Sequence, residues 1–144
     1  MRDTVRIPAF SLAPASADAS FRRYFRATLA EPWDAAPGAP SLIVMDAPPA
    51  NEDCAPFIRV AALLADAGVH APIVLAQDLE RGYLLLTDLG TTTYAAALTP
   101  ATAPGLYGDA LDALVRWQRA SSAGVLPAYD DTLLRRELDL FPDW

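Results

Sequence analysis

Short strand-like segments most strongly constrain the fold of this 144-residue chain. Residues 22–28 mix aromatic and other strand-favouring side chains, and residues 41–47 contain an unbroken apolar run from Leu42 to Met45. The run is short, which favours a buried strand over a helix. Residues 31–39 between the two segments contain two prolines and one glycine. These features predict two strands joined by a loop.

An amphipathic helix is expected next in the chain. Prolines at 48–49 end the preceding strand, and Asn51 or Asp53 is expected to cap a helix that runs to about Ala67 and is closed by Gly68. Its apolar stripe follows the spacing i, i+3, i+4 and i+7 and consists of Phe57, Val60, Ala61 and Leu64. This stripe predicts that one side of the helix is buried.

Two further strands are expected at 73–76 and 83–87. The polar connection between them contains Glu80, Arg81 and Gly82, which are favourable turn residues. Together with the first two strands, these segments predict an antiparallel sheet of four or five strands.

The pattern becomes helical after Gly90. We expect a short helix capped by Thr91, a longer helix at about 106–121 that is broken at 121–124, and a last helix capped by Asp130. The apolar face of the longer helix consists of Tyr107, Ala110, Leu111, Leu114, Val115 and Gln118. The corresponding face of the last helix consists of Leu134, Leu138 and Phe141. Sheet first and helices later indicate an α+β fold.

Charge and composition argue against several classes of partner. The formal net charge is -7 at pH 7, which disfavours generic binding to nucleic acid or to an anionic membrane. No segment approaches the roughly 18 to 20 apolar residues of a membrane-spanning helix. The single cysteine, Cys54, cannot form an internal disulfide, and His70 has no metal-binding partner at a suitable spacing. We expect a cytoplasmic protein without a nucleic-acid or membrane partner.

A cluster of positive charge stands out in this acidic, lysine-free chain. Three of its eleven arginines lie within five positions: Arg22, Arg23 and Arg26. They follow the small polar loop 16–20, and together they predict a phosphate-binding site. In an extended strand Arg23 faces away from the other two, and the sequence leaves open which arginine meets the anion. The alternative is a solvated strand face paired with Asp18 and Glu31.

Several stretches of the chain resemble the aminoglycoside phosphotransferase superfamily. They are 20–26 (SFRRYFR), 43–49 (IVMDAPP), 67–72 (AGVHAP) and 84–90 (LLLTDLG). Within that superfamily the chain is most similar to the bacterial anomeric sugar kinases of cell-wall recycling, which act on N-acetylmuramate and N-acetylglucosamine. Two further stretches carry this similarity, 126–130 (LPAYD) and 138–144 (LDLFPDW).

The resemblance implies a protein-kinase-like N-lobe at 1–87, a hinge at 88–90 and the helical start of a truncated C-lobe at 91–144. The N-lobe would be an antiparallel five-stranded sheet plus one helix. The implied reaction is transfer of a phosphoryl group from ATP, with Mg²⁺, to the anomeric hydroxyl of an N-acetylated amino sugar. The family's catalytic loop and metal-binding aspartate are expected beyond Trp144. No catalytic or metal-binding residue is therefore assigned in this chain, which alone is expected to be inactive.

The resemblance also implies the residues that contact the nucleotide. The loop over the phosphates would consist of Ser16, Ala17, Asp18, Ala19 and Ser20. Leu86 would be the gatekeeper, and the Thr87 carbonyl and Leu89 amide would meet the adenine edge on either side of Asp88. Val44 would form part of the apolar roof over the base.

The chain departs from the family at the ion pair that usually holds the phosphates. Asp46 falls at or near the position of the strand lysine, and Phe57 falls roughly at that of the helix glutamate. Since both partners are missing, Arg22 or Arg23 is expected to replace the lysine. In the alternative interpretation Asp46 is a simple turn or helix-entry residue.

Two other functions stay open at this point. One is a kinase of the same superfamily for another acceptor, such as an aminoglycoside, choline or homoserine. The other is a non-catalytic module that binds a nucleotide or a partner protein. We also expect self-association through the apolar helical face that truncation would leave open, by exchange of the terminal helices.

Overall fold

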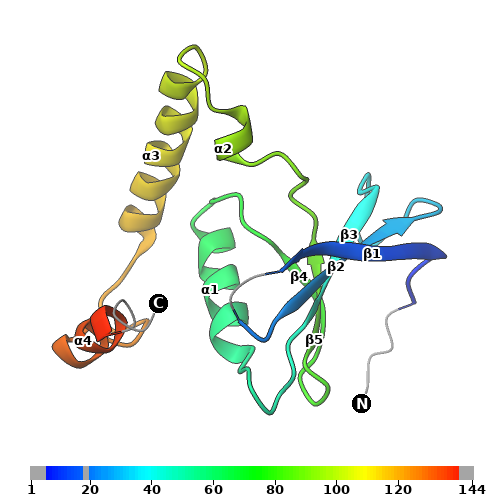
Figure 1. The fold of residues 1–144 in the computed structure, drawn as a ribbon, viewed down its shortest axis with the longest axis horizontal. Coiled ribbons are helices and arrows are strands. Elements are labelled where there is room, and N and C mark those ends of the chain that lie inside the picture. The colour runs from blue at the N-terminus through cyan, green and yellow to red at the C-terminus, as the bar shows by residue number, and fades with distance from the viewer. Residues whose placement is uncertain (1–5, 18–19, 140–144) are drawn as a thin grey trace.

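A computed structural model describes residues 6–17 and 20–139 of the chain. Within these residues five antiparallel strands form one sheet in the order β1-β2-β3-β5-β4 (Figure 1). The strands are β1 (Phe10–Ala17), β2 (Arg23–Leu29), β3 (Ser41–Asp46), β4 (Val74–Asp78) and β5 (Tyr83–Thr87). Together with the helix after β3, they confirm the predicted α+β fold with a five-stranded antiparallel sheet.

The helices lie on one side of the sheet in Figure 1. They are α1 (Ala55–Asp66), α2 (Tyr94–Ala97), α3 (Ala103–Ala120) and α4 (Asp131–Asp139). The first of them, α1, lies next to the sheet, whereas α3 and α4 stand further away (Figure 1). Among the helices in the described ranges, none is long and apolar enough to cross a membrane.

Several predicted boundaries are corrected by the structure. Ser16 and Ala17 belong to β1 rather than to a loop, because they pair with Tyr24 and Arg23 in the sheet. Asp18 and Ala19, the next residues of the predicted loop, lie outside the described residues. The predicted loop therefore begins at least two residues later than the sequence indicated.

The predicted helix caps are partly correct. Cys54 is the N-cap of α1 and gives no side-chain cap, but the Asp53 carboxylate accepts a hydrogen bond from the Ala55 amide at 2.9 Å. Thr93, not Thr91, caps α2, because the helix begins at Tyr94 and only the N-cap hydroxyl reaches the Ala96 amide.

The later helices follow the predicted pattern with small changes. The third helix, α3, begins at Ala103, earlier than predicted, since a proline in its first turn interrupts no intrahelical hydrogen bond. It ends at Ala120, as the predicted break at 121–124 requires. Asp130 caps α4 as predicted, with its carboxylate 3.0 Å from the Leu133 amide, and Phe141 lies outside the described residues.

The sheet is apolar on both faces. Met45, Leu84 and Leu86 pack on the face that is covered by α1, with Phe57 and Ile58 of that helix against them. Leu42 and Leu85 pack on the opposite face, where Trp33 and Ala36 of the loop after β2 cover them. Because successive side chains of a strand point to opposite faces, this two-sided burial explains the continuous apolar runs in β3 and β5.

The predicted apolar face of α3 is not covered in the structure. Tyr107, Leu111, Leu114 and Val115 are 58%, 61%, 48% and 40% exposed. In the described part of the chain, α3 has no buried residue. The helix therefore contributes no side chain to the two buried clusters.

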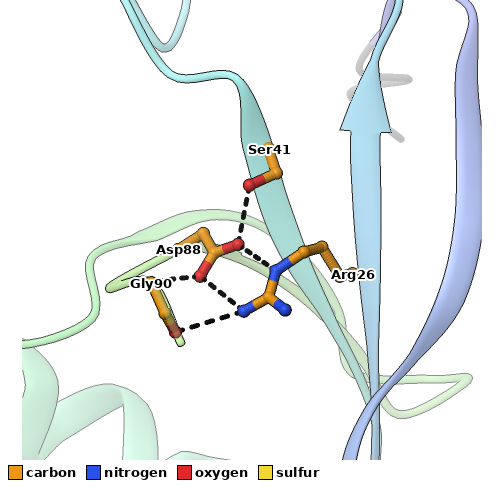
Figure 2. A network of polar contacts seen from close by, with 4 residues as sticks. All are labelled: Arg26, Ser41, Asp88 and Gly90. Carbon is orange, nitrogen blue, oxygen red and sulfur yellow. Dashed lines mark hydrogen bonds and ion pairs between the residues drawn. The ribbon is translucent and has the colours of Figure 1, made fainter. Parts of the chain in front are cut away.

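Arg26 and Asp88 tie the segment that follows β5 to the sheet (Figure 2). Arg26 donates from Nε to Asp88 Oδ2 at 2.5 Å and from Nη2 to Asp88 Oδ1 at 3.1 Å. Ser41 Oγ donates to Asp88 Oδ2 at 2.7 Å, and the Gly90 amide donates to Oδ1 at 2.8 Å. A further bond of 3.2 Å joins Arg26 Nη2 to the Gly90 carbonyl. This network joins β2, β3 and residues 88–90 around one carboxylate.

The same network changes the acidity of Asp88. Its hydrogen bond from Arg26 lowers the pKa, burial raises it, and the bonds from Ser41 and Gly90 lower it further, to about 2. The carboxylate is only 6% exposed, so water contributes little to its solvation. The folded chain therefore favours the charged form of Asp88.

We predict that Asp88→Asn lowers the free energy of unfolding at pH 7 by about 1 to 2 kcal/mol. The pKa of Asp88 is lower in the folded chain than in the unfolded chain, where it is about 3.9. Its stabilisation is thus complete above about pH 4 and is lost as the pH falls through about 2. Urea unfolding of both proteins at several pH values should show their difference shrinking over this range. The exposed Asp112→Asn is the matched control, and a difference that stays constant from pH 7 to pH 2 would contradict the prediction.

We also predict that Gly82→Ala destabilises the fold by about 2 to 4 kcal/mol. Gly82 has a φ of +78°, and a Cβ there would lie 2.0 Å from the Ala47 carbonyl oxygen. Gly38→Ala is the control, because Gly38 has a φ of +76° and nothing within 4 Å of the added Cβ. It should cost only the backbone strain, about 1 to 2 kcal/mol. Equal losses in the two variants, measured by chemical unfolding, would show that the close approach to Ala47 is unimportant.

Candidate functional site

A cavity of about 460 Å³ lies under the sheet, beside the segment that follows β5. Its apolar wall comes from Ile43 of β3, Leu86 of β5 and Phe57 of α1, and the rim comes from Ala15 and Ser16 of β1. Residues 87–91 close one side of it. The volume and the mainly apolar lining are typical of a small-molecule site.

The cavity brings together several residues that the sequence analysis singled out. Ser16, Leu86, Thr87, Asp88 and Leu89 all line it, although they come from two strands and the segment after β5. Ser20 lies at the end of the loop that leads into β2, where its hydroxyl accepts a hydrogen bond from the Arg22 amide at 3.1 Å. The cavity therefore gathers Ser16 and the residues at 86–89, but not the rest of the predicted set.

Val44 does not line the cavity. It packs on the opposite face of the sheet with Leu42 and Leu85, whereas the neighbouring Ile43 faces the cavity. Inside a continuous apolar run, the sequence does not distinguish one face from the other. Pairing with β2 settles the question, because Ile43 lies opposite Arg26, another residue of the cavity.

Sequence reasoning also missed Tyr24, Pro72 and Thr93, which line the cavity. Tyr24 is on β2 between two of the clustered arginines. Because successive side chains of a strand point to opposite faces, the sequence did indicate that Tyr24 and Arg23 face opposite ways. Pro72 and Thr93 lie in connections, and nothing in their local sequence indicates that the chain brings them to this place.

Backbone groups of the segment after β5 are unequally engaged. The Thr87 amide donates to the Ile73 carbonyl at 3.0 Å, and the Thr87 hydroxyl accepts from the Ile73 amide at 2.9 Å. The Leu89 amide donates to no acceptor within residues 6–17 and 20–139. A backbone donor at the edge of the cavity is thus available to a ligand.

The clustered arginines each pair with a different carboxylate. Arg22 pairs with Glu52 at 3.0 Å, Arg23 with Asp46, and Arg26 with Asp88. None of these partners is a sequence neighbour, and the predicted alternative partner Glu31 is not among them. Asp18, the other alternative partner, lies outside the described residues. The cluster is therefore a set of three separate ion pairs.

Asp46 is the last residue of β3 and the register partner of Arg23 on β2. It is 7% exposed and lies on the sheet face away from α1. Asp46 is therefore a buried ion-pair partner of Arg23 and not only a turn or helix-entry residue. On the α1 side, the neighbouring position is occupied by the fully buried Met45. No cation of β3 therefore faces the cavity.

Arg22 occupies the space between the loop and the start of α1. Glu52 Oε2 accepts a hydrogen bond from Arg22 Nε at 3.0 Å, and its Oε1 accepts one from the Phe21 amide at 3.2 Å. Burial lowers the pKa of Arg22, but Glu52 and Tyr24 raise it by more, so the guanidinium is firmly charged. Burial raises the pKa of the nearby Cys54 thiol, which Arg22 only partly offsets. Cys54 is therefore a buried thiol rather than a nucleophile.

A second cavity, of about 520 Å³, lies between α1 and residues 121–128. Among the described residues that line it, Asp66 is the only charged one. Within the described ranges, no three His, Cys, Asp or Glu side chains are placed to hold a metal ion. The smaller cavity under the sheet is thus the better candidate for an anionic ligand.

Comparison with known proteins agrees with this architecture. The model of the phosphotransferase enzyme family (APH) matches residues 11–144. Over 138 residues the chain is 59% identical to an N-acetylmuramate/N-acetylglucosamine kinase of Pseudomonas aeruginosa and 54% identical to one of Pseudomonas putida. A protein of the same name from Neisseria meningitidis is 40% identical over 139 residues.

These matches cover almost all of this chain but only part of each relative. They include 96% of the chain for both Pseudomonas proteins and 94% for the Neisseria protein. The chain spans only 38% of the length of the first two relatives and 39% of the third. The sheet with its single packed helix is the kinase-like N-lobe that the sequence predicted. The chain belongs to the phosphotransferase enzyme family.

Proposed function

We propose that this chain is the nucleotide-binding part of an ATP-dependent kinase that phosphorylates the anomeric hydroxyl of N-acetylmuramate or N-acetylglucosamine. The observation that carries the proposal is the cavity between the sheet and residues 87–91, with the Leu89 amide at its edge unpaired among the described residues. The names of the similar proteins support the acceptor.

The adenine ring fits the apolar part of this cavity. In the proposed arrangement the ring lies between Ile43 and the segment 87–89, with Leu86 at its back. The Leu89 amide would donate to a ring nitrogen, and the Thr87 carbonyl would accept from the exocyclic amino group. Both contacts use backbone groups, which explains why the local sequence carries little signal for them.

The division of the chain into a lobe at 1–87, a hinge at 88–90 and a helical part at 91–144 is part of the same proposal. It is supported by the Asp88 network, which fixes the first residues after β5 to the sheet. The helices that follow α2 have no buried residue, in keeping with a separate part of the molecule.

The phosphates would extend from the cavity toward Ser16, Ser20 and the loop between them. The phosphotransferase family implies ATP and a divalent metal ion. The described residues hold no acidic cluster for that ion, so its ligands are expected in the part of the relatives that this chain does not span. Here the chain's own residues bind and orient the nucleotide.

A chimera with a relative tests the proposed catalysis. Replacing the matched 138 residues of the Pseudomonas aeruginosa relative with this chain should give a kinase that releases ADP when N-acetylmuramate or N-acetylglucosamine is present. Phosphorus NMR should show the phosphate on the anomeric oxygen. The chain alone, tested in parallel, should release no ADP.

The unmodified relative is the positive control for this chimera. Choline, homoserine and an aminoglycoside serve as comparison acceptors, and transfer to one of them in place of the amino sugars would contradict the proposed acceptor. A chimera that folds but binds no ATP would favour a non-catalytic partner-binding module instead.

Cytoplasmic location and self-association also remain proposals. The second is supported by the exposed apolar residues of α3, which form a continuous helical face. We predict that the 144-residue chain forms a concentration-dependent dimer in sedimentation experiments and that Leu111→Glu weakens this dimer at least 10-fold, because it places a charge in the contact. Asp112→Glu, on the same helix, is the control. A monomer at all concentrations would refute the proposal.

A further inference from the structure

Charge is available for a nucleotide from only one of the three clustered arginines. Arg26 is committed to the fold, since its Nε and Nη2 hold Asp88 and Nη2 also reaches the Gly90 carbonyl. Moving it to a phosphate would release the segment that borders the cavity. Arg26 is therefore a structural cation.

Arg23 lies on the wrong face of the sheet. Its register partner and ion-pair partner is Asp46, on the face that carries Leu42 and Leu85. Its side chain is 66% exposed, so it can bind ions from solvent, but the sheet separates it from the cavity. Arg23 is thus an unsuitable contact for a ligand bound under the sheet.

Arg22 is on the cavity side and is held through one nitrogen. Glu52, which precedes α1, takes the Nε of Arg22. A guanidinium carries five N–H donors in a planar fork, so the two terminal nitrogens remain for other acceptors. The Tyr24 hydroxyl lies close enough to raise the pKa of Arg22. Tyr24 lines the cavity, so Arg22 lies beside the proposed nucleotide site.

The position of Arg22, directly before β2, fits a nucleotide. Arg26 contacts Gly90 at the proposed adenine end, and Arg22 lies four residues earlier in the chain. Extended residues rise about 3.3 Å each, so the two positions are separated by about 13 Å. This is comparable to the span between a purine edge and the phosphates of a nucleotide triphosphate.

The pair of Arg22 and Glu52 is also well shielded. The two side chains are 30% and 11% exposed. An ion pair that is partly removed from water is stronger and more rigid than one on the open surface. Glu52 also accepts the Phe21 amide, which fixes the backbone at the end of the loop from β1 to β2.

We infer that Arg22 contacts the phosphates of the nucleotide and that Glu52 is its positioning residue. This pair would replace the lysine and glutamate that the chain lacks, with the cation moved from β3 to the start of β2. The inference rests on the proposed function, because it assumes that an adenine nucleotide occupies the cavity.

The test compares ligands that differ only in phosphate content. Binding of adenosine, ADP and ATP to the 144-residue chain is measured by calorimetry in EDTA, so that no metal ion screens the phosphates. Arg22→Gln should weaken the binding of ADP and ATP by about 10- to 100-fold, the range expected for hydrogen bonds to a charged group. Adenosine binding should change by less than about 2-fold, because adenosine has no phosphate. Arg23→Gln is the matched control and should leave all three affinities within about 2-fold.

Two further variants separate positioning from charge. Arg22→Lys keeps the positive charge but loses the planar fork. It should therefore retain part of the increase in affinity from adenosine to ATP. Glu52→Gln removes a negative charge, which by itself would strengthen the binding of an anion. Weaker ATP binding by Glu52→Gln would therefore report that Glu52 orients Arg22. Stronger ATP binding by this variant would overturn the positioning role of Glu52.

The outcomes distinguish the inference from the proposed function. If adenosine and ATP bind to the parent chain and Arg22→Gln keeps the full increase in affinity from adenosine to ATP, the inference is wrong and the nucleotide site stands. If the parent chain binds neither adenosine nor ATP, the proposed nucleotide site is contradicted and the inference falls with it. Circular dichroism checks that each variant is folded. If Arg22→Gln does not fold, the ATP affinities of Arg22→Lys and Glu52→Gln decide whether Arg22 contacts the phosphates.

Discussion

The ion pair between Arg26 and Asp88 is the interaction on which the candidate site depends. Its partners are 62 positions apart, and it joins the second strand to the segment that leaves the last strand of the sheet. Ser41 and the Gly90 amide complete the hydrogen bonds of the carboxylate, so a charge that is 6% exposed is well solvated by the protein. The same segment carries the Leu89 amide, which has no acceptor in the part of the chain that the structure describes, so this network also sets where a ligand can meet the backbone.

Four of the strands and the helices could be predicted from the sequence because they depend on local patterns, whereas β1 was implied only by the family resemblance. The apolar stripe of α1 and the turn residues before β5 both act within a few positions. The face on which a residue lies is different, as Ile43 and Val44 show. Both belong to one apolar run, and only the pairing of β3 with β2 decides that Ile43 reaches the cavity. Likewise, three consecutive threonines precede α2, and the position of the helix decides that Thr93 caps it.

Electrostatic partners were the least predictable part of the site. The sequence indicated nearby carboxylates for the arginine cluster, whereas the described partners are Asp46, Glu52 and Asp88. The first is set by strand register, the second by the approach of α1 to the sheet, and the third by the path of the chain after β5. Each of these is a property of the tertiary structure. A sequence pattern can therefore locate the positive charge without showing which arginine is engaged in structure and which is free to bind.

An acidic protein that binds a polyanion must keep its few cations both charged and correctly placed. Pairing each arginine with a carboxylate achieves this, because the attraction between the charges offsets the cost of desolvating the guanidinium when no ligand is present. The arrangement at Arg22 has a further consequence. Glu52 holds both the Arg22 side chain and the Phe21 amide, so the proposed phosphate contact and the end of the preceding loop share one carboxylate. A lysine on β3 would lack this connection. With Arg22 before β2 in place of a lysine on β3, the position of the loop between β1 and β2 is thus coupled to the charge that is proposed to contact the phosphates.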